Sequence, residues 1–114
     1  MSARLHRWDE ISLRKITETM SQKVVTGQRQ MLAQTYLKQG AQVPLHQHGS
    51  EQMTYVLQGA LRFQVAGETI VVRQGEVLLI GAETPHQAEA LEDTFQLDIF
   101  SPPRPEWMGD DDVA

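Results

Sequence analysis

The chain has 114 residues, 40% of them hydrophobic, and carries a formal net charge of −5. That length fits one compact domain, and the lack of cysteine excludes disulfides, thiolate metal sites and cysteine nucleophiles. A negative chain without a Lys/Arg cluster is a poor partner for nucleic acid, and no apolar run reaches the length of a membrane span or a signal peptide. We therefore expect one cytoplasmic domain, residues 1–114, that binds neither nucleic acid nor a membrane.

The first 30 residues show no clear hydrophobic period, and we expect an N-terminal arm there, residues 1–30. Within it, residues 11–20 are predicted either as a helical turn or as a strand that pairs with a neighbouring subunit. The core is predicted over residues 31–104, where short extended segments alternate with glycine turns. The predicted strands are 31–37, 43–48, 53–57, 61–65, 69–73, 77–80 and 94–100. Residues 105–114 are predicted to be a solvated acidic tail that includes Asp110, Asp111 and Asp112.

Short, numerous strands of this kind are typical of an all-β sandwich or a small barrel. Several of them have apolar residues on both faces, as where Met53, Tyr55 and Leu57 alternate with Thr54 and Val56. An apolar outer face needs a cover. We therefore expect a homodimer, with the N-terminal arm as a candidate for strand exchange.

Three of the four histidines fall into one pattern, because His46 and His48 alternate on a predicted strand and His86 lies on another strand far downstream. Alternate residues of a strand point to the same side, so the first two could present their imidazoles to one point. Gln52 shares their parity and follows a Gly-Ser pair where the chain can bend. The four side chains are candidate ligands for one divalent transition metal ion, which could be Ni, Zn, Fe, Mn or Co. The competing interpretation is that these are hydrogen-bonded or surface histidines.

The last predicted strand has two different faces. Phe95, Leu97 and Ile99 lie on one side, and Gln96 and Asp98 lie on the other. Periodicity alone favours a surface position for the two polar residues. A barrel that encloses a polar centre and covers its outer face would reverse that assignment.

The motifs resemble the cupin superfamily from Gly40 to about Arg104. The first cupin motif, G-x5-H-x-H-x3-4-E-x6-G, corresponds to Gly40, His46, His48, Gln52 and Gly59, with Gln52 in place of the usual Glu. The second motif, G-x5-P-x-G-x2-H-x3-N, retains Gly75 and His86 and differs at Gly81, Glu83 and Ala90. The resemblance implies a single cupin barrel, that is, a double-stranded β-helix or jelly roll, with a bound metal.

Within the cupins, the segments Ala90–Thr94 and Leu97–Arg104 are similar to the KdgF family of pectin-degradation proteins. That resemblance implies conversion of 4,5-unsaturated uronate monosaccharides, released from pectin or alginate, to linear ketonised forms. It implies that His46, His48, Gln52 and His86 hold the metal and that Asp98, Phe100 and Arg104 are catalytic.

The implied roles of these three residues each have a plainer alternative. Asp98 would carry protons, or it would be a structural hydrogen-bond acceptor. Arg104 would pair with the uronate carboxylate, or it would be a surface ion-pair residue. Phe100 would shape the pocket, or it would simply pack in the core.

Two further functions stay open from the sequence. A metal-dependent cupin dioxygenase would need iron and oxygen and would be indifferent to Arg104. A cupin that binds a sugar acid without turnover is the other alternative. The ligand types determine neither the metal nor the preference between pectin-derived and alginate-derived sugars.

Overall fold

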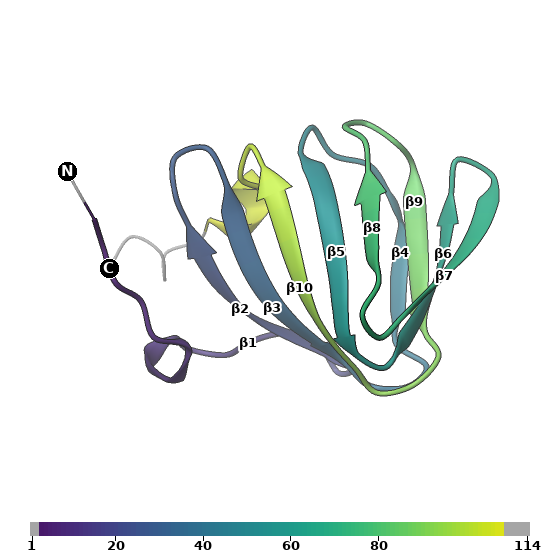
Figure 1. The fold of residues 1–114 in the computed structure, drawn as a ribbon, viewed down its shortest axis with the longest axis horizontal. Helices are drawn as coiled ribbons and strands as arrows, with labels where there is room; N and C mark the ends of the chain where they lie inside the picture. Colours follow the sequence, from purple (N-terminus) through teal and green to yellow (C-terminus); the bar gives the residue numbers. More distant parts are fainter. Residues whose placement is uncertain (1–2, 109–114) are drawn as a thin grey trace.

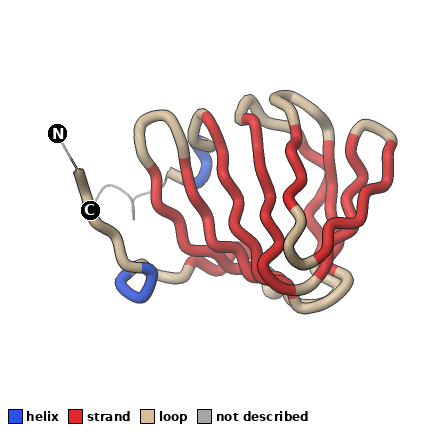
Figure 2. The backbone as a smooth tube through the Cα atoms, viewed as in Figure 1, coloured by secondary structure: helices blue, strands red, loops and turns tan. Residues whose placement is uncertain are grey.

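The computed structural model describes residues 3–108 and consists mainly of strands (Figures 1 and 2). In that part of the chain, two short 3-10 helices lie outside the sheets, η1 (Trp8–Glu10) and η2 (Pro105–Trp107). The strands are β1 (Arg14–Thr17), β2 (Met20–Thr26), β3 (Met31–Leu37), β4 (Gln42–His46), β5 (Glu51–Gln58), β6 (Ala60–Val65), β7 (Glu68–Arg73), β8 (Val77–Ile80), β9 (His86–Ala90) and β10 (Thr94–Ser101). No helix of residues 3–108 is long and apolar enough to cross a membrane. The acidic run at residues 110–112 lies outside the described residues.

The strands form two antiparallel sheets that pack against each other. The six-stranded sheet has the order β1-β2-β3-β10-β5-β8, and the four-stranded sheet has the order β4-β9-β6-β7. Strand β10 pairs along its length with both β3 and β5, which places it inside the larger sheet. In Figure 1 the larger sheet is in front, and the smaller one lies behind it and to the right. The predicted all-β jelly-roll barrel is confirmed.

The N-terminal segment differs from its prediction. Residues 14–17 form strand β1, which pairs with β2 of its own chain, so the strand alternative holds here and the helical turn does not. Strand β1 is the edge of the larger sheet, and its pairing with a neighbouring subunit stays a prediction. Strand β2 pairs with β3 from Met20↔Leu37 to Thr26↔Met31, and the larger sheet therefore begins before Met31, the predicted start of the core. Strand β9 is not among the segments delimited from the sequence, because His-Gln-Ala-Glu-Ala contains no β-branched or large apolar residue.

Apolar side chains fill the space between the sheets. The main cluster consists of Leu37, Ala41, Val56, Leu61, Phe63, Val72, Ile80, Ala88 and Ala90. A second cluster contains Val24, Met31, Ala33 and Phe100, with Trp107 packed against it. Phe100 is 1% exposed, and burial of a side chain of this size stabilises a fold by about 1.5–3 kcal/mol. Core packing is therefore part of what Phe100 does.

The inner face of β10 is largely polar. Thr94, Gln96, Asp98 and Phe100 are buried, whereas Ile99 on the other face is 40% exposed. The surface position that periodicity favours for Gln96 and Asp98 is therefore wrong, because the barrel turns this face inward. The fold places a carboxyl group in its interior.

The outer face of the larger sheet carries the apolar side chains of three neighbouring strands. Met53 and Tyr55 of β5, Val77 and Leu79 of β8, and Ile99 of β10 are 39–57% exposed. The strand register aligns Ile99, Met53 and Leu79 in one row across the sheet. Single exposed apolar residues are ordinary, but continuous rows of them are typical of an interaction surface.

Candidate metal centre

Three imidazoles meet at the end of the barrel toward which β10 and β8 run, at the top of Figure 1. His46 is the last residue of β4 and His86 is the first residue of β9, and these antiparallel strands place the two residues opposite each other. His48 follows in the loop after β4. One ring nitrogen from each of the three histidines lies within 4.8 Å of the other two. That spacing allows one metal ion to be shared by all three.

His48 is positioned by its loop, and the strand alternation predicted for it is wrong, since β4 ends at His46. The loop is joined to two other segments by hydrogen bonds. The backbone N–H of Glu83 donates to the carbonyl of His48 at 2.8 Å. Ser50 Oγ donates to the carbonyl of Pro102 at 2.5 Å. These bonds connect the His48 loop to the segment before β9 and to the segment after β10.

Each imidazole of the cluster has its Nδ1 beside a backbone carbonyl oxygen. The pairs are His46 with Pro44 at 2.8 Å, His86 with Thr84 at 2.8 Å and His48 with Ser50 at 2.9 Å. A carbonyl oxygen only accepts, so Nδ1 of His46 and of His86 carries the proton and their Nε2 atoms keep the lone pair. The Ser50 carbonyl favours the same tautomer for His48. Backbone carbonyls commonly orient the histidine ligands of metal sites in this way.

The surroundings of His86 Nε2 indicate whether these residues fit a metal ion. This atom is buried and has no hydrogen-bond partner among residues 3–108, and a buried acceptor in that state costs about 1–3 kcal/mol. A divalent ion would remove this cost. Burial also lowers the pKa of His46 and of His86, because a charged imidazolium would lose hydration there. The neutral form is the one that binds metal, so the residues present fit a divalent transition metal ion.

The side-chain amide of Gln52 lies beside the histidine cluster at the start of β5. Its Oε1 is 3.1 Å from His48 Nε2, and its Nε2 donates to Thr54 Oγ1 at 2.9 Å. The amide oxygen is therefore turned toward the imidazoles. As a neutral ligand it would leave the full charge of a divalent ion in place, whereas the carboxylate of the usual cupin Glu would cancel part of it.

Asp98 lies in the barrel interior and is 3% exposed. Its carboxylate accepts hydrogen bonds from Thr35 Oγ1 at 2.9 Å, from Thr54 Oγ1 at 2.7 Å, and from Gln96 Nε2 at 3.1 and 3.0 Å. Burial raises the pKa of Asp98 in spite of these bonds, which act in the opposite direction. A raised carboxyl pKa suits proton transfer near neutral pH, and the hydrogen bonds fix the position of the group.

Arg104 is held against two aromatic rings. Its side chain is 12% exposed, and its guanidinium carbon lies 3.9 Å from the centre of the Trp107 ring and 5.3 Å from that of Phe100. Its Nη2 is 3.3 Å from a carboxylate oxygen of Glu106, and its Nε has no hydrogen-bond partner in the part of the chain that the structure describes. The guanidinium is thus fixed in place and keeps a donor for an anion.

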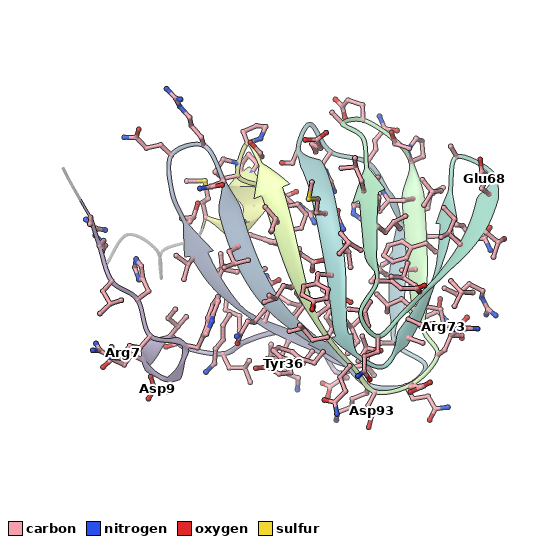
Figure 3. The ribbon with its side chains drawn as sticks, in the orientation of Figure 1. Arg7, Asp9, Tyr36, Glu68, Arg73 and Asp93 are labelled. Carbon is pink, nitrogen blue, oxygen red and sulfur yellow. The ribbon has the colours of Figure 1, made fainter. Side chains whose placement is uncertain are left out.

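All candidate site residues except His48 line one cavity between the sheets. The cavity has a volume of about 50 Å³, and its walls include His46, Gln52, His86, Asp98, Phe100 and Arg104. A larger open groove, of about 1000 Å³, lies at the other end of the barrel and is lined in part by Tyr36 and Asp93, which Figure 3 labels. The clustered histidines, Asp98 and Arg104 therefore lie at the opposite end of the barrel from the larger groove.

Sequence reasoning missed three residues of this site. Thr35 and Thr54 are ordinary strand residues in the sequence, and only the shared parity of Thr54 with Gln52 places it on the same face. Trp107 falls in the predicted acidic tail, yet its ring covers the Arg104 guanidinium. Its aromatic character next to a Pro-Pro-Arg segment was the one available signal.

Comparison with known proteins gives a family and several structural relatives. The family model of the cupin domain matches residues 33–101. The uncharacterized protein MJ1618 of Methanocaldococcus jannaschii is 31% identical over 75 residues, which make up 65% of this chain and 60% of that protein. The chain therefore spans less than two thirds of this curated relative.

Two solved structures align over nearly the whole chain. KdgF from Halomonas sp. is 27% identical with a TM-score of 0.85, and the alignment covers 92% of this chain and 98% of that one. An RmlC-like cupin from Shewanella frigidimarina is 20% identical with a TM-score of 0.86, covering 93% of this chain and 96% of that one. The second likeness shows the fold alone, because its sequence identity is low.

Proposed function

The chain belongs to the cupin domain family, and from that premise we propose that it is a metal-dependent enzyme that acts on sugar acids. Its substrates would be 4,5-unsaturated uronate monosaccharides from pectin or alginate, and its products their linear ketonised forms. One observation carries the proposal: the carboxyl of Asp98, the guanidinium of Arg104 and two of the three clustered imidazoles, His46 and His86, line the same cavity. The similarity to KdgF over nearly the full length of both chains supports it.

The proposed metal centre consists of His46, His48, Gln52 and His86. A divalent ion bound there supplies a Lewis acid that stabilises negative charge on a substrate oxygen. The protein's part is to hold three imidazoles and one amide oxygen in a fixed arrangement: backbone carbonyls orient the imidazoles, and Thr54 Oγ1 holds the amide.

Arg104 is the proposed partner of the substrate carboxylate. A guanidinium can bind a carboxylate through two parallel hydrogen bonds, and stacking on Trp107 limits the orientations that the Arg104 side chain can take. The cavity of about 50 Å³ has room for a few water molecules, less than a uronate needs. Arg104 and Trp107 would therefore shift as the substrate enters.

Asp98 is the proposed proton carrier. The reaction is an isomerisation in which the anomeric hydroxyl loses a proton, the bond between the anomeric carbon and the ring oxygen breaks, and an alkene carbon gains a proton as the enol becomes a ketone. A carboxyl that takes up the first proton can return it at carbon. The raised pKa of Asp98 makes it a stronger base than an exposed aspartate.

The test first measures the metal content of the protein and then the loss of the substrate's alkene absorbance. Elemental analysis of the purified protein should find about one divalent ion per chain, and His48→Ala should lose most of it. Metal-loaded protein should remove the conjugated-alkene absorbance of the unsaturated monosaccharide faster than the spontaneous reaction. Asp98→Asn keeps the shape but removes the base, so turnover should fall about a hundredfold or more. Arg104→Ala should weaken both substrate capture and rate.

Arg62→Ala is the matched control for the arginine variant, because Arg62 pairs with Glu89 in an exposed position. It should leave the rate unchanged. If metal-loaded wild type does not exceed the spontaneous rate with either the pectin-derived or the alginate-derived sugar, the proposed reaction is wrong. Oxygen uptake that requires iron would then favour the dioxygenase, and sugar binding without turnover would favour the binding protein.

A further inference from the structure

The orientation of the Gln52 amide is unusual in its immediate surroundings. His48 Nδ1 lies 2.9 Å from the carbonyl oxygen of Ser50, and His48 Nε2 lies 3.1 Å from the Oε1 of Gln52. Both oxygens only accept, so a neutral ring donates to one of them at a time. In the tautomer that binds a metal through Nε2, the proton is on Nδ1, and the Nε2 lone pair then faces the amide oxygen, which repels it. Rotating the amide by half a turn would instead give His48 Nε2 an N–H donor.

The other end of the amide explains why it keeps its orientation. Gln52 Nε2 lies 2.9 Å from Thr54 Oγ1. The Thr54 hydroxyl has a single proton, and this proton points to Asp98 Oδ1 at 2.7 Å. A carboxylate can only accept, so Thr54 Oγ1 is left as an acceptor toward Gln52. A rotated amide would place its oxygen against that acceptor, and the threonine therefore selects the N–H end.

The fold holds Asp98 in place, and it therefore also fixes which groups donate and which accept in the chain from Gln52 through Thr54 to Asp98. Thr35 Oγ1 donates to its Oδ2 at 2.9 Å, and Gln96 Nε2 donates to both oxygens. All of these groups are buried, so water does not readily replace any one donor.

We propose that Thr54 is a positioning residue that turns the oxygen of Gln52, and not its NH2 group, toward the metal-binding imidazoles. This inference rests on the proposed metal centre and is independent of the sugar. The inference explains why a hydroxyl residue, Thr54, lies two positions after Gln52. The side chain of Gln, unlike that of Glu, has one oxygen that can coordinate a metal and one NH2 group that repels a cation. The usual cupin Glu has two equivalent oxygens and needs no such selection.

The experiment measures the affinity of metal-free protein for Ni²⁺ by calorimetry, without substrate. Thr54→Val keeps the shape and removes the hydroxyl, and the dissociation constant should rise about tenfold, within the range found for outer-shell partners of metal ligands. Thr54→Ser restores the hydroxyl and should return the affinity to within about twofold of wild type. Circular dichroism checks that each variant folds, and Thr54→Ala replaces Thr54→Val if the latter does not.

Thr35→Val is the matched control, because Thr35 also donates a buried hydrogen bond to Asp98 but has no hydrogen bond with Gln52. It should leave the affinity within about twofold of wild type. A second control repeats Thr54→Val in a Gln52→Glu background, where the two carboxylate oxygens are equivalent and the effect should shrink below about twofold.

Three results would overturn the inference. The first is an unchanged affinity in Thr54→Val, and the second is an equal loss in Thr35→Val, which would indicate a general effect through Asp98. The third is an undiminished loss in the Gln52→Glu background. Failure of wild type to bind Ni²⁺ would instead refute the metal centre itself, so the two failures are distinguishable.

Discussion

Gly59, which ends the first cupin motif, contacts the start of β10, the strand that carries Asp98, and we predict that this contact contributes to the stability of the fold. Gly59 lies between β5 and β6 with φ of +97°. A Cβ added there would be 2.5 Å from the carbonyl oxygen of Asp93, 2.5 Å from Thr94 Oγ1 and 2.8 Å from Thr94 Cα. Two of these atoms belong to the backbone at the start of β10. Gly59→Ala must therefore displace that backbone or distort its own turn.

The expected cost has two parts. The left-handed conformation costs an alanine about 1 kcal/mol, and overpacking against backbone adds about 1–3 kcal/mol. Gly59→Ala should thus lower the free energy of unfolding by about 2–4 kcal/mol, a large share of the roughly 5–15 kcal/mol that is typical of a domain. Urea denaturation followed by circular dichroism measures the difference.

Gly67→Ala separates the cost of the left-handed conformation from the cost of overpacking. Gly67 has φ of +88°, and no atom lies within 4 Å of its added Cβ. Only the conformational cost of about 1 kcal/mol should appear. If the two variants lose the same stability, the contact between the Gly59 turn and β10 contributes nothing and the reasoning is refuted.

Three further predictions concern pH, strain and assembly. Burial lowers the pKa of His46 and His86 in the fold, so below their ordinary value of 6.5 the unfolded chain binds more protons. The raised pKa of Asp98 acts in the opposite direction, because the folded chain then binds the additional proton, so the histidine effect is measured in Asp98→Asn. Metal-free Asp98→Asn should lose stability as the pH falls below 6.5, by at most about 1.4 kcal/mol per pH unit for each histidine; equal urea midpoints at pH 7 and pH 5 in this variant would contradict the prediction. Glu83 has φ of +59° at the second motif's glycine position, so Glu83→Gly should raise the urea midpoint by removing about 1 kcal/mol of strain, and a lower midpoint would count against it. The apolar rows on the outer face of the larger sheet predict a homodimer, which light scattering would detect as twice the chain mass, whereas a monomer mass at micromolar concentration would refute it.

Much of the fold followed from local pattern. Alternation of apolar residues between glycine turns predicts β3 and β5 to β8 within a few residues, because a half-buried strand needs a period of two and a tight turn needs positive φ. Strands β2 and β9 were not predicted, because the buried Gln22 interrupts the apolar alternation of β2 and the inward residues of β9 are a histidine and two alanines. The sequence alone also selected the histidines and Gln52, through residue type and spacing.

The tertiary structure decided which face of each strand points into the barrel and which residues far apart in the sequence come into contact. The alternation of β10 was visible in the sequence, but closure of the barrel determines that Asp98 points inward. The hydroxyls that hold Asp98 come from Thr54 and Thr35, which are 44 and 63 positions away in the chain. No local propensity records such contacts, because they exist only once β3, β5 and β10 lie side by side. The orientation of the Gln52 amide depends in turn on Thr54, and the stacking that fixes Arg104 depends on Trp107.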